Sequence, residues 1–214
     1  MAEQTEPHVG SVIDSLGKVN QSRLRFGRMT ERRPATEAEA RALASAVRLR
    51  IIRLCLDRAL TNKEIAERLG ANAATTLHHV RTLVDTGFLV PQPTRRGARG
   101  SREVPYLSTG KSWTLDVSDA AVPGPRPAML DAFLAEAETA GLDRVDMSRL
   151  GLRLTEDDYH ELRRRIQAIL DEYAARPRDP AGRPYSVFVA FHADVSREES
   201  PAATRSTRPP DETP

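Results

Sequence analysis

Two helices separated by a tight glycine turn are predicted between Thr61 and Gly87. Thr61 and Glu64 match a capping box, in which a hydroxyl and a carboxylate bind free amides of the first helical turn. Gly70 suits the left-handed cap that ends this helix, and Asn72 is a preferred N-cap for the next one. A short helix, a tight turn and a second helix make a helix-turn-helix. This order of caps therefore restricts the segment to that motif.

Further helices and a hairpin are predicted around this motif. Thr36 and Glu39 form another capping box before a helix that runs to about Ser45, and residues 47–56 are amphipathic and basic. Residues 88–90 and 104–107 are strand-like, and QPTRRGARGSRE lies between them. Arginines interleaved with glycines cannot pack in a core, so we expect an exposed cationic hairpin, or wing. Residues 34–117 are thus predicted to be a winged helix-turn-helix domain.

The helix after Asn72 is expected to have one packed face and one polar face. Threonine and histidine on the polar face could contact base edges, and Arg81 could reach guanine or a phosphate. The alternative, an ordinary solvated helix surface, is equally weighted for any single residue. The wing arginines favour the nucleic-acid interpretation, because a hairpin there would follow the sugar-phosphate backbone or the minor groove. The predicted DNA contacts are Lys63, Asn72, Ala73, Ala74, Thr75, His78, His79, Arg81, Arg95, Arg96, Arg99 and Arg102.

Charge is unevenly distributed along the chain. Residues 45–111 hold twelve Lys and Arg against five Asp and Glu, whereas residues 118–195 hold ten against fourteen. The basic block is what a DNA-binding half requires. With 39% hydrophobic residues, 29% charged residues, no membrane-length apolar run and no signal-like start, the chain is predicted to be cytoplasmic, with no membrane partner.

The motifs from residue 43 to residue 90 resemble the ArsR-type winged-helix regulators. Arg48 near the start of a leucine-rich helix, EIA at residues 64–66, His79 followed by valine, and TGFLV at residues 86–90 occupy the places of the family pattern. The resemblance implies a homodimer that binds an inverted repeat in double-stranded DNA and often represses transcription. It also implies that residues 72–81 and the wing arginines contact DNA.

The sequence departs from the metal-sensing branch of that family. Its single cysteine, Cys55, lies among aliphatic residues and is predicted to be a core thiol. His78 and His79 are adjacent and point about 100° apart on a helix, so they cannot chelate one ion well. Glu156 and His160 are four residues apart but lack a third ligand. We therefore predict no metal site and no cofactor.

The remaining chain divides into an arm, a second domain and a tail. Residues 1–33 are predicted to be a flexible arm, and AVPGPRP at residues 121–127 is predicted to be a domain junction. Residues 126–195 are expected to form a small α+β domain for dimerisation or effector binding, with helices at residues 128–140 and after Thr155, and strands at residues 148–154 and 185–192. Trp113 and Tyr185 are candidates to line an effector pocket, although a packing role for this half is the simpler interpretation. Residues 196–214 are predicted to be disordered.

These patterns predict an α+β protein that binds DNA in a sequence-specific way as a homodimeric repressor, with a small-molecule effector left open. The alternative is a winged-helix protein-interaction module within a larger transcription or chromosome complex. No nucleophile–base set or phosphate-binding glycine loop occurs in the sequence, so the chain is predicted not to be an enzyme.

Overall fold

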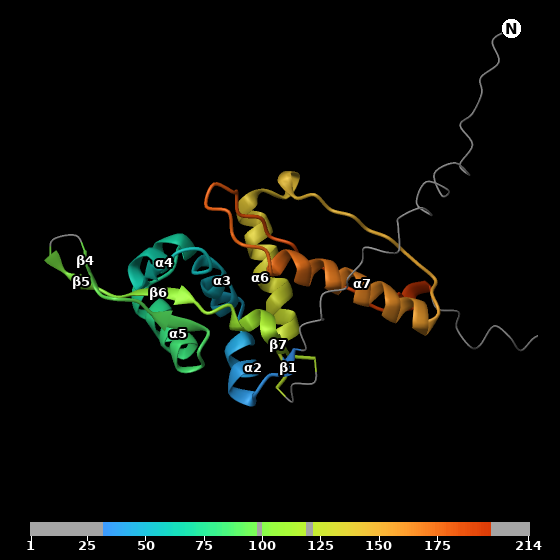
Figure 1. Cartoon of the computed structure of the whole chain (residues 1–214), viewed down its shortest axis with the longest axis horizontal. Helices are drawn as coiled ribbons and strands as arrows, with labels where there is room; N and C mark the ends of the chain where they lie inside the picture. Colours follow the sequence, from blue (N-terminus) through green and yellow to red (C-terminus); the bar gives the residue numbers. More distant parts are fainter. Residues whose placement is uncertain (1–31, 98–99, 119–121, 198–214) are drawn as a thin grey trace, which may run out of the picture. The chain divides into compact units, whose positions relative to one another are not determined.

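The computed structural model describes residues 32–97, 100–118 and 122–197 (Figure 1). Most of the predicted N-terminal arm, most of the predicted C-terminal tail and the wing residue Arg99 lie outside the described residues. The chain divides into two compact units, of which one contains residues 32–153 and 180–197, and the other contains residues 154–179.

Four helices make up the predicted helical part of the DNA-binding domain. They are α2 (Glu37–Leu43), α3 (Ala46–Leu54), α4 (Asn62–Leu69) and α5 (Ala73–Asp85). Both capping boxes form as predicted, at Thr36 with Glu39 and at Thr61 with Glu64. Gly70 has a φ of 62°, a left-handed conformation that favours glycine, and it ends α4 as the sequence indicates.

Short strands complete this domain. Strands β2 (Leu60–Thr61), β6 (Pro105–Ser108) and β3 (Leu89–Pro91) form an antiparallel sheet in that order. Strands β4 (Arg95–Arg96) and β5 (Arg102–Glu103) pair as the hairpin, which projects beyond α4 and α5 in Figure 1. The 3₁₀ turn η2 (Lys111–Thr114) leads into strand β7 (Leu115–Asp116). Strand β1 (Arg33–Pro34) pairs with β7 in parallel. The predicted winged helix-turn-helix is confirmed.

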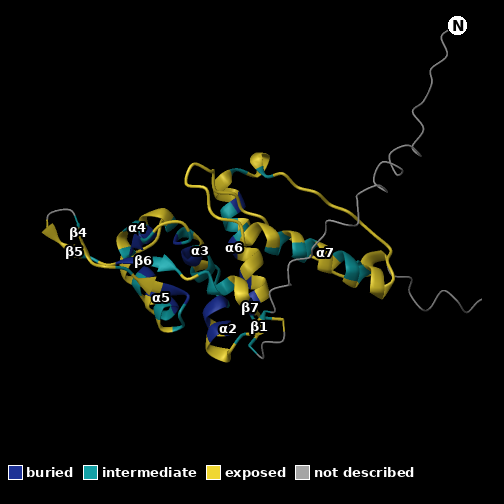
Figure 2. Ribbon diagram, viewed as in Figure 1, coloured by how far each residue is buried: buried dark blue, intermediate teal, exposed yellow. Residues whose placement is uncertain are grey.

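The hydrophobic core lies between these helices and the sheet (Figure 2). Ile51, Ile65, Val80 and Leu83 are fully buried in it, and Phe88, which directly precedes β3, is buried with them. Cys55 is buried in the same cluster, and burial raises the pKa of its thiol to about 11. It is a core residue, as predicted.

Helix α6 (Pro125–Ala140) packs against α3 and α2. Its buried positions after Pro125 are the small residues Ala128, Ala132 and Ala137, which let the helix axes come close. Arg53 of α3 pairs with Glu136 at 3.0 Å. The sequence places a domain junction just before this helix. The structure instead puts α6 in the same compact unit as the winged helix, because its small face fits the surface of α3.

The two strands predicted in the C-terminal half do not form. Residues 148–154 and 185–192 have no strand pairing in the structure, and Leu150 and Tyr185 are 77% and 84% exposed. A strand needs a neighbouring strand to bind its amide and carbonyl groups, and an apolar, β-branched composition does not by itself supply that neighbour. The prediction of a small α+β unit at residues 126–195 is therefore wrong in its strands. Tyr185 lies on the surface, while the Arg32 guanidinium lies over Trp113, 4.4 Å from the ring centroid.

The second compact unit contains helix α7 (Glu156–Ala174). Thr155 caps it by accepting a hydrogen bond from the Asp158 amide, as predicted, and three acidic residues in its first turn suit the positive end of the helix dipole. Turns η3 (Leu142–Arg144) and η4 (Val195–Arg197) belong to the first unit. The chain as a whole is α+β, as predicted.

Candidate nucleic-acid interface

Helix α5 has one buried face and one exposed face. Thr76, Val80 and Leu83 are buried against the core. Ala73, Ala74, Thr75, His78 and Arg81 are all exposed on the other side. Five of the predicted contacts therefore share one accessible surface of the second helix of the motif.

The turn before α5 holds this surface in place. The Asn72 Oδ1 atom accepts a hydrogen bond from the Ala74 amide at 2.8 Å, so this side chain caps the helix. The Asn62 side chain donates to the Ala73 carbonyl at 2.8 Å and ties the start of α4 to the start of α5. Lys63, on the first turn of α4, is exposed and lies 3.9 Å from Glu67. Its ammonium is thus available at the rim of the surface.

His79 differs from the other predicted contacts, because it is half-buried. Its Nδ1 atom is buried without a hydrogen-bond partner among the described residues. Burial, together with the positive charge of Arg48, lowers the pKa of His79. The ring lies between the core and the exposed face, where His78 is more accessible.

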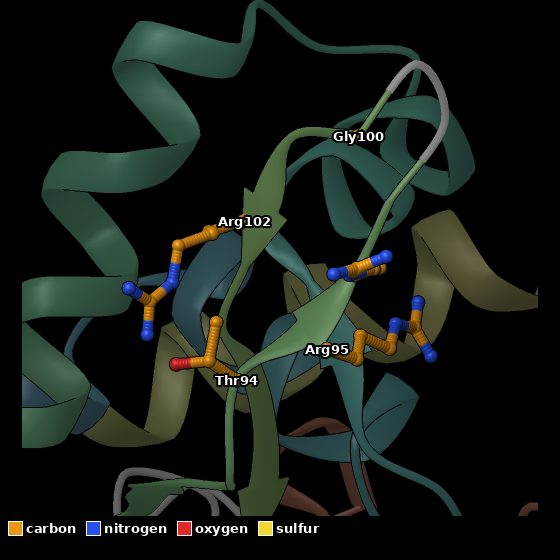
Figure 3. A pocket seen from close by; sticks show the side chains of 5 residues that line it. Thr94, Arg95, Gly100 and Arg102 are labelled. Carbon is orange, nitrogen blue, oxygen red and sulfur yellow. The ribbon is translucent and has the colours of Figure 1, made fainter.

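The hairpin places two arginines directly opposite each other. In the β4–β5 register Arg96 pairs with Arg102, and both are exposed. Like charges opposite each other destabilise a two-stranded ribbon unless an anion lies between or beside them. Thr94, Arg95, Arg96, Gly100 and Arg102 line an open pocket of about 500 Å³ at this point, and Arg95 and Arg102 extend from opposite sides of the hairpin in Figure 3.

Arg95 has a different role, which the sequence analysis missed. Its guanidinium binds the Glu64 carboxylate at 2.8 Å and lies 3.8 Å from Glu103. The other oxygen of Glu64 accepts the Thr61 amide at 2.7 Å, and these bonds to Thr61 and Arg95 lower the pKa of Glu64. One carboxylate therefore caps α4 and connects it to the base of the wing. The capping-box prediction identified Glu64 but not its second partner, because that partner is distant in the sequence.

A close approach inside the wing explains one of its glycines. A Cβ atom at position 97 would lie 2.3 Å from the Glu103 carboxyl group, closer than non-bonded atoms can approach. The Gly97 amide donates to the Ser101 carbonyl at 2.7 Å and closes the hairpin. Glycine at position 97 thus leaves room for Glu103 beside Arg95.

A buried carboxylate supports the far end of α5. Glu39, with a side chain 8% exposed, binds Arg33 through both oxygens and binds the Lys111 ammonium at 2.6 Å. Lys111 also donates to the Thr86 carbonyl, at the C-cap of α5, at 2.6 Å. The Arg33 guanidinium is the main cause that holds the pKa of Glu39 far below its usual range. This cluster joins β1, α2 and η2 to the end of the exposed helix.

The helix-turn-helix part of this arrangement also occurs in known proteins. A family model described as a helix-turn-helix domain matches residues 43–92, which include α3, α4, α5 and β3. Residues 43–92 thus match a helix-turn-helix domain, and the sheet and hairpin around them complete a winged helix-turn-helix fold. No curated protein matches the chain.

Several solved structures are similar to this chain over part of its length. Reduced HlyU from Vibrio cholerae is 22% identical, covering 45% of this chain and 84% of HlyU, with a TM-score of 0.28. The homodimeric winged helix-turn-helix domain of Mb0332 from Mycobacterium bovis, a possible ArsR-family regulator, is 17% identical, covering 70% and 100%, with a TM-score of 0.30. ZitR from Lactococcus lactis in complex with DNA is 17% identical, covering 78% and 99%, with a TM-score of 0.24. At such TM-scores these structures add no argument of their own.

Two features of the described residues concern metal binding and membrane insertion. No three His, Cys, Asp or Glu side chains in residues 32–97, 100–118 and 122–197 come together in a way that could hold a metal ion. In the same ranges, every helix is too short or too polar to cross a membrane. The prediction of no metal and no cofactor stays a prediction.

Proposed function

We propose that the chain is a homodimeric repressor that binds a specific sequence of double-stranded DNA, with α5 in the major groove and the wing on the backbone or minor groove. The pairing of Arg96 with Arg102 carries this proposal. Two arginines at opposite positions in the register of an exposed hairpin are electrostatically costly alone, and a phosphate backbone would supply negative charge there.

The dimensions of α5 suit this role. A helix of 13 residues is about 20 Å long, and the major groove is about 12 Å wide, enough to admit one helix. Ala73 and Ala74 at its start are small enough to approach the groove floor closely. Thr75 and His78 can then donate to or accept from base edges, while Arg81 reaches guanine or a phosphate.

A homodimer follows from the ArsR-type resemblance. Two copies related by a two-fold axis present two α5 helices to half-sites about one helical turn apart, roughly 34–36 Å, which is why the target is an inverted repeat. Residues 126–195 supply the dimer contacts in this proposal. A repressor of this kind blocks transcription by occupying its site on DNA.

The exposed face of α5 is expected to determine sequence preference. We expect Thr75→Ala and His78→Ala each to reduce the discrimination between the preferred site and single-base variants by roughly 5- to 100-fold, which corresponds to about 1–3 kcal/mol per base contact. Selection of bound sequences from a random library, followed by competition binding, measures this. Glu138→Gln, at an exposed position of α6, is the matched control and should leave the preference unchanged. If both α5 variants kept the DNA sequence preference of the wild type, α5 would not be the helix that contacts the bases.

Arg95 is expected to position the wing and not to bind phosphate. Arg95→Ala should therefore weaken DNA binding by several-fold while the slope of log K against log salt stays unchanged, because Glu64 already neutralises this guanidinium. Arg96→Ala, the matched control on the same strand, should lower the slope by about one. Glu64→Gln should weaken binding to a similar extent, and the double variant should be no weaker than either single variant. A lower slope for Arg95→Ala would show that Arg95 releases a counterion itself.

A further inference from the structure

Helix α7 has an apolar stripe with the spacing of a coiled coil. Its large apolar side chains follow one another in steps of three and four residues, at Tyr159, Leu162, Ile166, Ile169 and Tyr173. These steps average 3.5 residues, the period that keeps a stripe facing a second helix when two helices wind around each other. The stripe occupies the a and d positions of two heptads, so α7 carries the sequence pattern of a helix that pairs with another helix.

The stripe is accessible to a second helix. Every residue of α7 is at least partly exposed (Figure 2), and Ile169 and Tyr173 are 55% and 61% exposed. Most helices in proteins owe their stability to the packing of an apolar face. Side chains at a and d point into the space between paired helices, so pairing along this stripe would bury the same side chains that are exposed here.

The charges beside the stripe favour a second copy of α7 that runs antiparallel. In that arrangement Ile166 packs opposite Ile169 of the other copy. Arg165, next to Ile166, then faces Glu172 of the other copy, and the two-fold axis repeats this ion pair. A shift by one heptad would instead place Arg165 opposite Arg165, and the two would repel each other. The charge pattern thus selects one register.

A parallel pair fits the same charges less well. Asp158 would reach Arg163 in such a pair, but the three arginines at residues 163–165 would lie level with the same three arginines of the other copy. In the antiparallel pair they lie level with residues 170–172, which include two carboxylates. Antiparallel helices also place the positive end of one dipole beside the negative end of the other.

The existing partners of Arg165 and Glu172 do not prevent the pairing. Arg165 binds Glu161 at 2.6 Å and Glu172 binds Arg176, in both cases one helical turn away, and the two side chains are 68% and 63% exposed. Exposed pairs with this spacing contribute little to stability, so both side chains can turn to a second helix at low cost. Glu161 also binds Arg164 and keeps that cation.

The size of the stripe predicts a weak dimer. Its three aliphatic and two aromatic side chains bury on the order of 100 and 150 Å² each, about 600 Å² per partner, below the ~800 Å² of a standard interface. We therefore expect a dissociation constant in the micromolar range, with tighter association when two copies occupy one DNA site.

We propose that α7 of two copies pairs as a short antiparallel coiled coil, in which Arg165 of each copy faces Glu172 of the other. The inference rests on the homodimer under the proposed function and assigns its interface to one helix.

Charge reversal in the full chain tests this arrangement. Arg165→Glu alone places two glutamates opposite each other at both ion pairs, and Glu172→Arg alone places two arginines there. Each variant should therefore dimerise at least roughly tenfold more weakly than the wild type. An equimolar mixture of the two variants restores both opposite-charge pairs, so its association should return to within about threefold of the wild type. Analytical ultracentrifugation measures the dissociation constants, and circular dichroism checks the helix content of each variant.

The matched controls lie on the opposite side of α7. Arg164→Glu and Asp157→Arg make the same charge changes at exposed f positions, and they should leave dimerisation unchanged, alone and mixed. Ile169→Asp places a carboxylate in the stripe at a position that is exposed in the single chain, so it should abolish the dimer and leave the chain folded.

The possible results separate this inference from the proposed function. Weak association of each variant alone, with recovery only in the mixture of Arg165→Glu and Glu172→Arg, supports the pairing. A wild-type dimer that all these variants preserve, or that the mixture does not restore, overturns the antiparallel α7 pair and leaves the homodimeric regulator intact. A wild-type chain that stays monomeric up to about 100 µM, without DNA and with it, overturns both the pairing and the homodimer.

Discussion

Replacing Glu39 by glutamine should lower the free energy of unfolding by about 2 kcal/mol at pH 7. The buried carboxylate accepts hydrogen bonds from Arg33, Lys111 and the Thr36 amide. Glutamine keeps the shape of the side chain but loses the charge that both cations require. Because Lys111 also binds the Thr86 carbonyl, the end of α5 should become more mobile in the variant. Denaturant unfolding measures the stability, and amide hydrogen exchange at residues 80–86 measures the mobility.

The effect of Glu39 should depend on pH in a defined direction. Arg33 lowers the pKa of Glu39 in the folded state, so the carboxylate contributes its full stability above the pKa of the unfolded chain, about 4.3. This contribution is lost progressively as pH falls below that value, and the difference between the wild type and Glu39→Gln should shrink with it. Glu37→Gln, on the same helix but paired with Arg41 at the surface, is the matched control and should change stability little. A difference between the wild type and Glu39→Gln that is unchanged from pH 7 to pH 3 would contradict the ionic role of Glu39.

The double variant Arg96→Ala with Arg102→Ala should lose most of the wing's contribution to DNA binding. If each guanidinium displaces one counterion from the phosphate backbone, the slope of log K against log salt falls by about two, and affinity near 0.1 M salt falls roughly 10- to 100-fold. Fluorescence anisotropy with a labelled duplex, at several salt concentrations, measures both quantities. The variant should be at least as stable as the wild type, because the two opposed charges are removed from the hairpin.

The stability of the double variant helps to interpret its binding. Weak binding by a protein that unfolds at the wild-type temperature assigns the loss to the removed charges. Arg53→Ala, which removes an arginine from α3 that pairs with Glu136, changes the net charge without touching the wing and serves as the control. An unchanged salt slope in the double variant would exclude the wing from the backbone contact.

The helix boundaries of the DNA-binding domain could be predicted because they depend on local chemistry. Thr36, Thr61 and Asn72 cap helices through atoms two or three residues away, and Gly70 adopts a left-handed conformation that other residues rarely tolerate. Each of these signals depends only on residues within one helical turn of the chain. The exposed face of α5 and the wing followed from periodicity and from arginines interleaved with glycines.

The long-range parts of the candidate site could not be predicted in the same way. The pairing of Arg95 with Glu64 joins residues that are 31 positions apart, and no local pattern identifies such a partner. The burial of His79 depends on how α5 rotates against its neighbours, which a helical wheel places only roughly. The strand at residues 185–192 was predicted from composition, but a strand also needs a neighbouring strand, which composition does not identify; these residues are not a strand in the described structure.

Binding of the intact protein to DNA tests the central claim most directly. Genomic fragments from the source organism are incubated with the protein at low salt, the bound fragments are selected and sequenced, and the affinity for the selected sequence is measured from about 50 to 200 mM salt. The proposed function predicts one enriched inverted repeat, bound at least 10³-fold more tightly than unrelated DNA, with log K falling linearly as log salt rises. No binding above background at low salt would contradict it and would favour a winged-helix protein-interaction module.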